Sequence, residues 1–175
     1  NGAWEAVLEN AYDIIVTSEI NGEDTLSFKI PYRDGKRGYI DSEKKIQIVD
    51  DVYKVRTVTD TRDTDGSAVT EVYAEAEFYD LTFSVRKEER TFEAEYPETA
   101  MAYALEGTEW SVGTVTVRTQ RTWTSTEKNA LSILRNTADL HGGDLVFDCP
   151  NRLVHLLTVN GKDSGALFAY KKNMK

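Results

Sequence analysis

The acidic segment 60–66 is the first place in this chain where a metal ion could bind. A calcium-binding loop carries acidic residues at its first, third and fifth positions, a glycine at the sixth and a bidentate glutamate at the twelfth. When the glycine of the segment takes the sixth position, Asp63 and Asp65 fit, but Thr61 and Val72 stand where carboxylates are needed. A calcium ion would lack its bidentate ligand, so the pattern favours a solvated loop between two strands.

Three glutamates that are close in the sequence, Glu71, Glu75 and Glu77, could form a carboxylate pair for acid–base chemistry. Such pairs work only when burial or a neighbouring charge separates their pKa values. Glu71 and Glu75 alternate with the apolar Val72 and Ala74, which is the pattern of a strand with one face in water. The pattern therefore predicts a solvated face and no catalytic pair.

The two histidines and the single cysteine lack the spacing of a catalytic or metal site. His141 is expected in the last turn of a helix, where the helix dipole favours a cation, and His155 lies on an expected strand. Cys149 lies at a turn without a histidine at a spacing typical of a nucleophile and its base. The sequence also lacks G-x-S-x-G, H-E-x-x-H and phosphate-binding glycine motifs. We therefore expect no catalytic residue, cofactor-binding residue or metal ligand, and we expect that this segment is not an enzyme.

Composition narrows the possible partners of the chain. The 175 residues carry a net charge of −9, so binding to nucleic acid through its phosphates is not expected. A single cysteine excludes an internal disulfide framework. The apolar runs are too short to span a bilayer, and the first ten residues lack the features of a signal peptide. Insertion of this segment into a membrane is therefore not expected.

Aromatic residues leave a carbohydrate-binding face open as an alternative. Trp4, Trp110, Trp123 and nine tyrosines could stack on the apolar faces of sugars. Packing is the other interpretation, in which Trp110, between Thr108 and Val112, anchors the junction of two lobes.

The first half of the chain has the pattern of a β-rich lobe. In residues 12–20, Tyr12, Ile14 and Val16 fall on one face, and Ile15 breaks the alternation, which suggests partial burial of both faces. Asn21-Gly22 predicts a hairpin turn, because both residues tolerate a positive φ. Further strands are expected at residues 25–30, 45–49, 52–60 and 69–76. So many short strands predict a small barrel or sandwich.

The pattern changes after about residue 80, and helical patterns follow. Pro97 is expected at the first position of a helix that closes at Gly107. Thr124 and Glu127 form a capping box for a second helix, which Gly142 terminates in the αL conformation. A strand at 112–118 and a final hairpin around Pro150-Asn151 complete the pattern. The predicted fold class is thus α+β, with a β-barrel-like lobe over residues 1–90 and a smaller α+β lobe over residues 91–175.

Several short segments occur in an order that resembles one known family. They are E-I-N-G at 19–22, L-S-F-K-I-P at 26–31, V-Y-K-V at 52–55, G-T-E-W-S-V-G at 107–113, the helix ending on Gly142-Gly143, D-L-V-F-D at 144–148 and G-K-D-S-G-A-L-F-A-Y-K-K-N at 161–173. Together they resemble the N-terminal region of phage minor structural proteins, the prophage endopeptidase tail family. Longer members of that family carry a tail-associated endopeptidase, or tail-associated lysin.

The resemblance implies a structural role in the virion. It implies a component of a phage or prophage tail tip or baseplate hub, which links the tail tube to the tip and to a downstream region that penetrates the host wall. The implied partners are distal tail and tube proteins and, in the full-length protein, a homotrimer whose lumen lets DNA pass without specific binding. It also implies that this chain is a fragment and that a peptidoglycan endopeptidase domain belongs to the downstream part of the parent. The alternatives are a carbohydrate-binding module or part of the peptidoglycan-cleaving endopeptidase itself.

Overall fold

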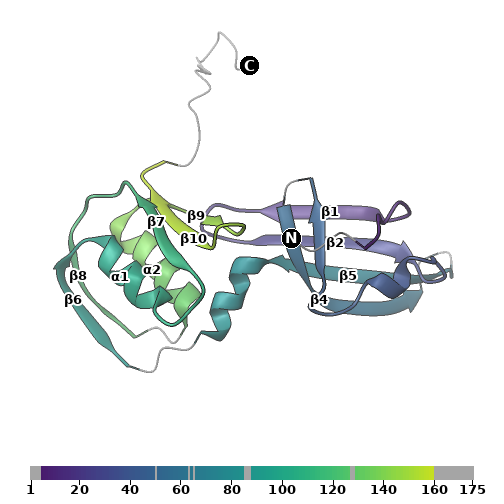
Figure 1. The fold of residues 1–175 in the computed structure, drawn as a ribbon, viewed down its shortest axis with the longest axis horizontal. Coiled ribbons are helices and arrows are strands. Elements are labelled where there is room, and N and C mark those ends of the chain that lie inside the picture. The colour runs from purple at the N-terminus through teal and green to yellow at the C-terminus, as the bar shows by residue number, and fades with distance from the viewer. Residues whose placement is uncertain are drawn as a thin grey trace, which may run out of the picture.

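The computed structural model describes residues 5–49, 51–62, 64, 66–84, 88–126 and 129–159. Two groups of elements lie next to each other along the longest axis of the molecule (Figure 1). We call residues 12–76 the first lobe and residues 90–157 the second lobe. A 3-10 helix, η2 (Glu77–Phe83), connects them.

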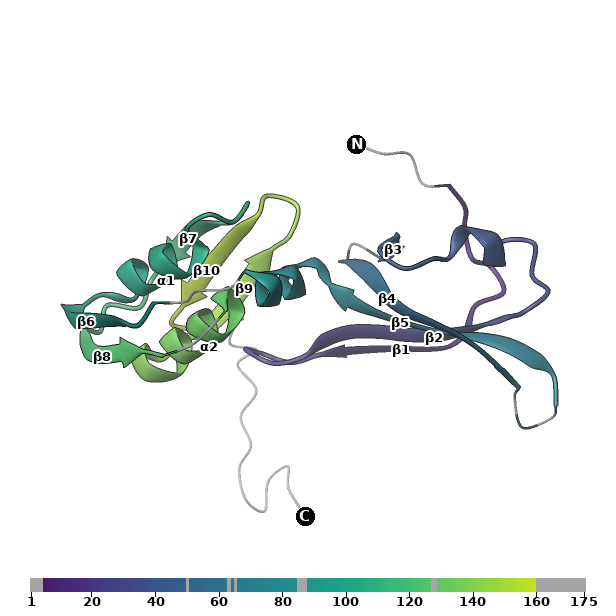
Figure 2. The same cartoon turned by 90° about the horizontal axis from the view of Figure 1, so that it is seen from below.

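The first lobe is a single antiparallel sheet of five strands. The strands are β1 (Tyr12–Ser18), β2 (Asp24–Pro31), β3 (Lys45–Ile48), β4 (Asp51–Arg62) and β5 (Ala68–Ala76). Their order across the sheet is β1-β2-β5-β4-β3, so β1 and β3 form its two edges. The sheet curls into a half-barrel (Figure 2), which confirms the barrel-like lobe expected from the sequence.

One face of this sheet is covered and the other is open. The covered face carries Leu26, Phe28 and Val72, and Leu8 and Ile40 pack against it from the segments around η1 (Arg37–Tyr39). In Figure 2 these segments lie on one side of the sheet only. The alternating pattern of the strands therefore separates a buried face from a polar face, as predicted.

The edge strand β1 differs from the prediction. Ile14, Ile15 and Val16 are 49%, 60% and 44% exposed, so the expected burial of this strand is wrong. The pairing with β2 shifts register between Tyr12 and Ile15, and Asp13 has a φ of 50°. This irregularity turns successive side chains away from the sheet, and none of the three apolar side chains joins the core.

The second lobe combines two helices with two small sheets. Its helices are α1 (Pro97–Leu105) and α2 (Ala130–His141), which pack against each other. One sheet pairs β6 (Arg90–Glu95) with β8 (Arg121–Ser125). The other has the order β7-β10-β9, formed by β7 (Ser111–Val115), β10 (Leu153–Leu157) and β9 (Asp144–Asp148). β10 is parallel to β7 and antiparallel to β9, which confirms the final hairpin.

The helix boundaries test the capping predictions. Pro97 occupies the first turn of α1, and Gly107, with a φ of 75°, follows its end as expected. The predicted capping box is wrong, because Thr124 lies in β8, and the side chain of Asn129 caps α2 by accepting from the N–H of Ser132 at 2.9 Å. Gly142 has the expected positive φ of 80°, but its ψ of 161° is extended, so the chain leaves α2 directly toward β9.

A single hydrophobic core extends through both lobes. Its buried residues run from the covered face of the first sheet, through Phe78 and Leu81 of η2, to both helices of the second lobe. Among the described residues, no helix is both long and apolar enough to cross a membrane.

Candidate functional site

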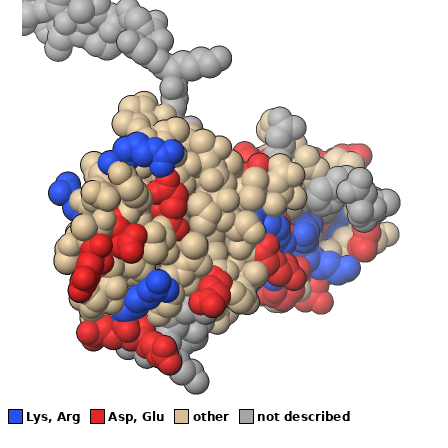
Figure 3. All heavy atoms as spheres, turned by 60° about the vertical axis from the view of Figure 1, so that its left-hand side comes forward, with Lys and Arg blue, Asp and Glu red and all other residues tan. Residues whose placement is uncertain are grey.

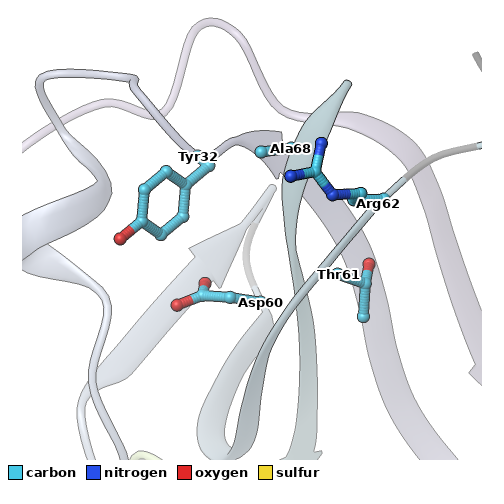
Figure 4. A pocket seen from close by; sticks show the side chains of 5 residues that line it. All are labelled: Tyr32, Asp60, Thr61, Arg62 and Ala68. Carbon is cyan, nitrogen blue, oxygen red and sulfur yellow. The ribbon is translucent and has the colours of Figure 1, made fainter. Parts of the chain in front are cut away.

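A shallow depression of about 470 Å³ lies at the end of the first lobe, lined by Tyr32, Asp60, Thr61, Arg62 and Ala68 (Figure 4). Its charged groups already have partners. Asp60 accepts hydrogen bonds from Thr70 Oγ1 at 2.7 Å and from Arg37 Nη2 at 3.2 Å, and the Thr70 bond is the main cause that lowers its pKa. Arg62 donates to the carbonyl of Gly66 at 3.2 Å. The carboxylate of Asp60 and the guanidinium of Arg62 in this depression are thus both engaged in hydrogen bonds within the protein. This arrangement does not favour proton transfer to a bound molecule.

The predicted calcium loop lies partly outside the described residues, because Asp63 and Asp65 are not among them. Thr61 belongs to β4 and Val72 to the buried face of β5. Within the described ranges, no three His, Cys, Asp or Glu side chains come together in a group that could hold a metal ion. The expected absence of calcium stays a prediction.

Each predicted candidate for nucleophilic chemistry contacts a different part of the second lobe. Burial, followed by the charge of Glu77, raises the pKa of Cys149 to about 11, so the thiol stays protonated at neutral pH. Nδ1 of His141 lies 2.9 Å from the carbonyl oxygen of Thr119. Nδ1 of His155 accepts a hydrogen bond from the backbone N–H of Thr114 at 2.8 Å. These contacts use Nδ1 of each histidine, and neither of them joins a histidine to Cys149.

The three glutamates are likewise separated by their partners. Glu71 is exposed and lies 3.8 Å from Lys29, whereas Glu75 accepts from Arg56 at 3.1 Å. The side chain of Glu77 is only 8% exposed and contacts Lys45 at 2.5 Å and Arg152 at 3.6 Å. Each carboxylate is thus neutralised by its own cations.

Aromatic side chains form the apolar part of the junction between the two lobes. Trp110 is 5% exposed and meets the ring of Phe147 edge-on, with centroids 6.1 Å apart. Phe147 stacks on Phe78 of η2, with centroids at 4.0 Å. Trp110 is thus buried behind Phe147, which itself contacts η2, and its role as an anchor between two lobes stays a prediction. Trp123 packs on Phe92, whereas Trp4 lies outside the described residues.

The polar part of the junction centres on Asn21, at the tip of the β1–β2 hairpin. Its Nδ2 donates to the carbonyl of Gly143 at 3.0 Å, and its Oδ1 accepts from the N–H of Leu145 at 2.6 Å. Beside it, Arg135 of α2 donates to the carbonyl of Gly22 at 2.6 Å. Asn21 therefore pairs with the backbone of the other lobe as a strand would, because one amide supplies both a donor and an acceptor.

Sequence reasoning identified Asn21-Gly22 only as a turn. The φ of 57° at Asn21 confirms that turn, but the partners of its amide are 122 and 124 residues away. An asparagine whose amide forms hydrogen bonds within its own turn has the same local sequence as one whose amide forms hydrogen bonds with another lobe. The only available signal was the row of apolar residues after Gly143, which marks a strand but not its neighbour.

The exposed edge strand β1 is the second feature with functional consequence. Two of its exposed apolar residues, Ile14 and Ile15, border a groove of about 670 Å³ over the open face of the sheet, which Lys29, Thr57 and Tyr73 also line. The opposite edge, β3, instead exposes Lys45 and Gln47. Natural sheets usually protect a free edge with charges or a bulge. β1 has one charged residue, Asp13, and an irregular pairing with β2, but unlike β3 it also exposes three adjacent apolar side chains.

Charge is mixed over the surface. Figure 3 shows basic and acidic side chains interspersed on the face that it presents, without a continuous basic tract. This distribution agrees with the net charge of −9 and does not favour binding to phosphates.

Comparisons with known proteins agree with this architecture. The family model for the prophage endopeptidase tail N-terminal domain matches residues 1–76, and that for the prophage endopeptidase tail domain matches residues 84–156. The prophage tail protein gp18 from Listeria monocytogenes EGD-e has a similar structure, with a TM-score of 0.75 at 13% identity over 97% of this chain and 52% of that chain.

The tail protein from Neisseria meningitidis MC58 is similar with a TM-score of 0.57 at 11% identity, over 94% of this chain and 51% of that chain. The chain thus spans about half the length of these two solved proteins. At such identities the likeness concerns the fold. No curated protein sequence matches the chain significantly.

Proposed function

Since this chain belongs to the prophage endopeptidase tail family and is a structural protein of a phage tail, we propose that it is part of the baseplate hub at the tail tip. In this role it links the tail tube to the tip and to the downstream region that penetrates the host wall. Its partners are the distal tail and tube proteins, and the full-length protein is a homotrimer.

The observation that supports this proposal is the apolar edge strand of an open half-barrel. Strand β1 exposes Ile14, Ile15 and Val16, and among the described strands it pairs with β2 alone, so it forms one edge of the sheet. Such an edge is a liability in an isolated protein but is useful in an assembly, where a neighbouring chain covers it. We therefore assign the contact with neighbouring tail subunits to β1 and the groove beside it.

The junction between the lobes supports a load-transmitting role. Asn21, Arg135 and the Phe78–Phe147 stack connect the lobes by hydrogen bonds and aromatic contacts, and the buried Glu77 adds ion pairs across the same boundary. A link between tube and tip needs lobes that keep a fixed orientation, because a hinge there would absorb the applied force. We propose that the chain divides near residue 90 into the two predicted lobes and that this junction fixes their orientation.

Catalysis is assigned to another part of the parent protein. The thiol of Cys149 is half-buried and protonated, and the carboxylates of the described residues considered above are paired with cations. The packing of Trp110 inside the junction also removes it from any sugar-stacking face. A hub component through which DNA passes without specific binding suits these features and the net negative charge.

Light scattering on two proteins tests the proposal. We expect the full-length parent to be a trimer and residues 1–175 alone to be monomeric or weakly associated, because part of the interface area is then missing. Ile15→Lys in the parent should abolish the trimer, since it places a charge on the β1 edge. Tyr32→Lys is the matched control, because Tyr32 is similarly exposed, at 48%, but lines the other depression and neither belongs to β1 nor borders the groove beside it. A monomeric parent would contradict the hub-ring role, and a trimer that tolerates Ile15→Lys would contradict the use of β1.

A further inference from the structure

We propose that His155 is a proton-sensitive latch that holds β7 against β10 only while its imidazole is neutral. This role lies outside tail assembly and concerns the stability of the second lobe. It rests on a hydrogen bond, an irregular strand pairing and a glycine that the ring requires.

The latch lies where the pairing of two parallel strands is interrupted. The register between β10 and β7 shifts between Val154 and Leu156, so one extra residue of β7 lies opposite His155. At this point the backbone N–H of Thr114 donates to Nδ1 of His155 at 2.8 Å. The imidazole therefore replaces the carbonyl that would have satisfied this N–H in a regular sheet.

The imidazole of His155 fits at this position only because residue 113 is a glycine. A Cβ atom on Gly113 would lie 2.6 Å from both Nδ1 and Cε1 of His155, closer than real contacts allow. The imidazole therefore lies directly against the backbone of Gly113. This contact gives a physical reason for the last glycine of the segment G-T-E-W-S-V-G, which the sequence alone left as a motif.

Protonation is incompatible with this arrangement. A neutral imidazole can accept at Nδ1 when Nε2 carries the proton, whereas the imidazolium donates from both nitrogens. The N–H of Thr114 would then face a second N–H. The proposal therefore predicts a fold that is less stable in acid than at neutral pH, because the unfolded chain binds the proton without losing this hydrogen bond.

Few charged side chains lie on the elements next to the ring. Strand β7 carries no charged side chain, β9 contributes Asp144 and Asp148, and Arg152 precedes β10. Hydrogen bonds from Asn151 are the main cause that lowers the pKa of Asp148.

Release of the latch would affect the junction between the lobes. Beyond the irregularity, the chain leaving β7 buries Val115 and Val117 in the core. Val117 lies so close to Gly143 that a Cβ atom there would be 2.7 Å from its Cγ2, and the carbonyl of Gly143 accepts from Asn21. The proton-sensitive segment thus adjoins the residues that hold the first lobe.

NMR on residues 1–175 tests the latch without any substitution. A long-range ¹H–¹⁵N spectrum should show His155 with its proton on Nε2 at neutral pH. The amide signal of Thr114 should shift with the titration of His155, and its hydrogen exchange should lose protection at acidic pH. A proton on Nδ1 at neutral pH, or a Thr114 amide that does not respond to this titration, would overturn the proposal.

His155→Asn provides the matched variant, because its Oδ1 can take the place of Nδ1 as an acceptor but does not titrate. Between pH 7.5 and pH 5.0, the melting temperature of the unmodified chain should decrease by about 2–4 °C more than that of the variant, the shift expected for one hydrogen bond in a protein of this size. His141 is common to both proteins, so its contribution cancels. Equal decreases in the two proteins would contradict a latch at His155.

Discussion

Replacing Asn21 should uncouple the two lobes, and the cost can be worked out from its contacts. Asn21→Gly suits the observed φ of 57° but removes both hydrogen bonds to the second lobe. One lost bond leaves the part-buried N–H of Leu145 without its partner, at about 1–3 kcal/mol, and the other contributes about 0.5–1.5 kcal/mol. Because solvent can reach part of this site, we expect the free energy of unfolding to decrease by an amount near the middle of the combined range, about 2–3 kcal/mol. Asn21→Ala should cost roughly 1 kcal/mol more, since alanine disfavours a positive φ.

Urea unfolding gives the free energies, and hydrogen exchange at the amide of Leu145 reports the junction itself. Asn21→Asp is the informative control, because it keeps the acceptor for Leu145 at 2.6 Å and loses only the donor to Gly143. Its loss of stability should therefore be the smallest of the three. If Asn21→Gly unfolds within about 0.5 kcal/mol of the unmodified chain and Leu145 stays protected, the amide does not hold the lobes together.

Two further predictions concern single side chains. Val49→Gly should raise the stability by about 1 kcal/mol in urea unfolding, because a β-branched residue with a φ of 54° is strained and its side chain, 85% exposed, contributes little packing; an unchanged or lower stability would contradict the assignment of strain. The second prediction concerns Asp80: burial raises the pKa of this carboxyl group, but hydrogen bonds from Arg56 and Lys54 outweigh burial, so the pKa is lowered overall. The ionised carboxylate therefore stabilises the fold at pH values above the ordinary aspartate pKa of about 3.9. This contribution is lost as the pH falls below that value and through the lower pKa of the folded state. Asp80→Asn should therefore lower the urea midpoint more at pH 7 than at pH 3, and an equal loss at both values would show that charge is not the cause.

Most elements of the fold could be predicted from local patterns. The alternation of apolar residues located the strands of the first lobe, and Pro97 and Gly107 marked both ends of α1. Asn21-Gly22 and Pro150-Asn151 marked two hairpin turns. These features depend on the conformational preferences of residues within one turn or one strand, which the sequence contains in full.

The errors arose where a local pattern had two outcomes. Thr124 fits a helix cap, but cross-strand pairing with Thr91 draws it into β8, and Asn129 takes the role of the cap. The apolar residues of β1 suggested burial, yet an edge strand with an irregular register leaves Ile15 exposed. In both cases the outcome depends on a neighbouring strand, which local sequence does not identify.

The candidate site shows the same division. Sequence by itself determined that Cys149, the histidines and the glutamates lack a catalytic spacing, that Trp110 suits an anchor and that the order of short motifs resembles tail proteins. Only the tertiary structure decided that the amide of Asn21 reaches Gly143 and Leu145, and that Nδ1 of His155 accepts from Thr114. The physical reason is that these hydrogen bonds join residues between 41 and 124 positions apart, so their geometry exists only after the helices, sheets and lobes have packed.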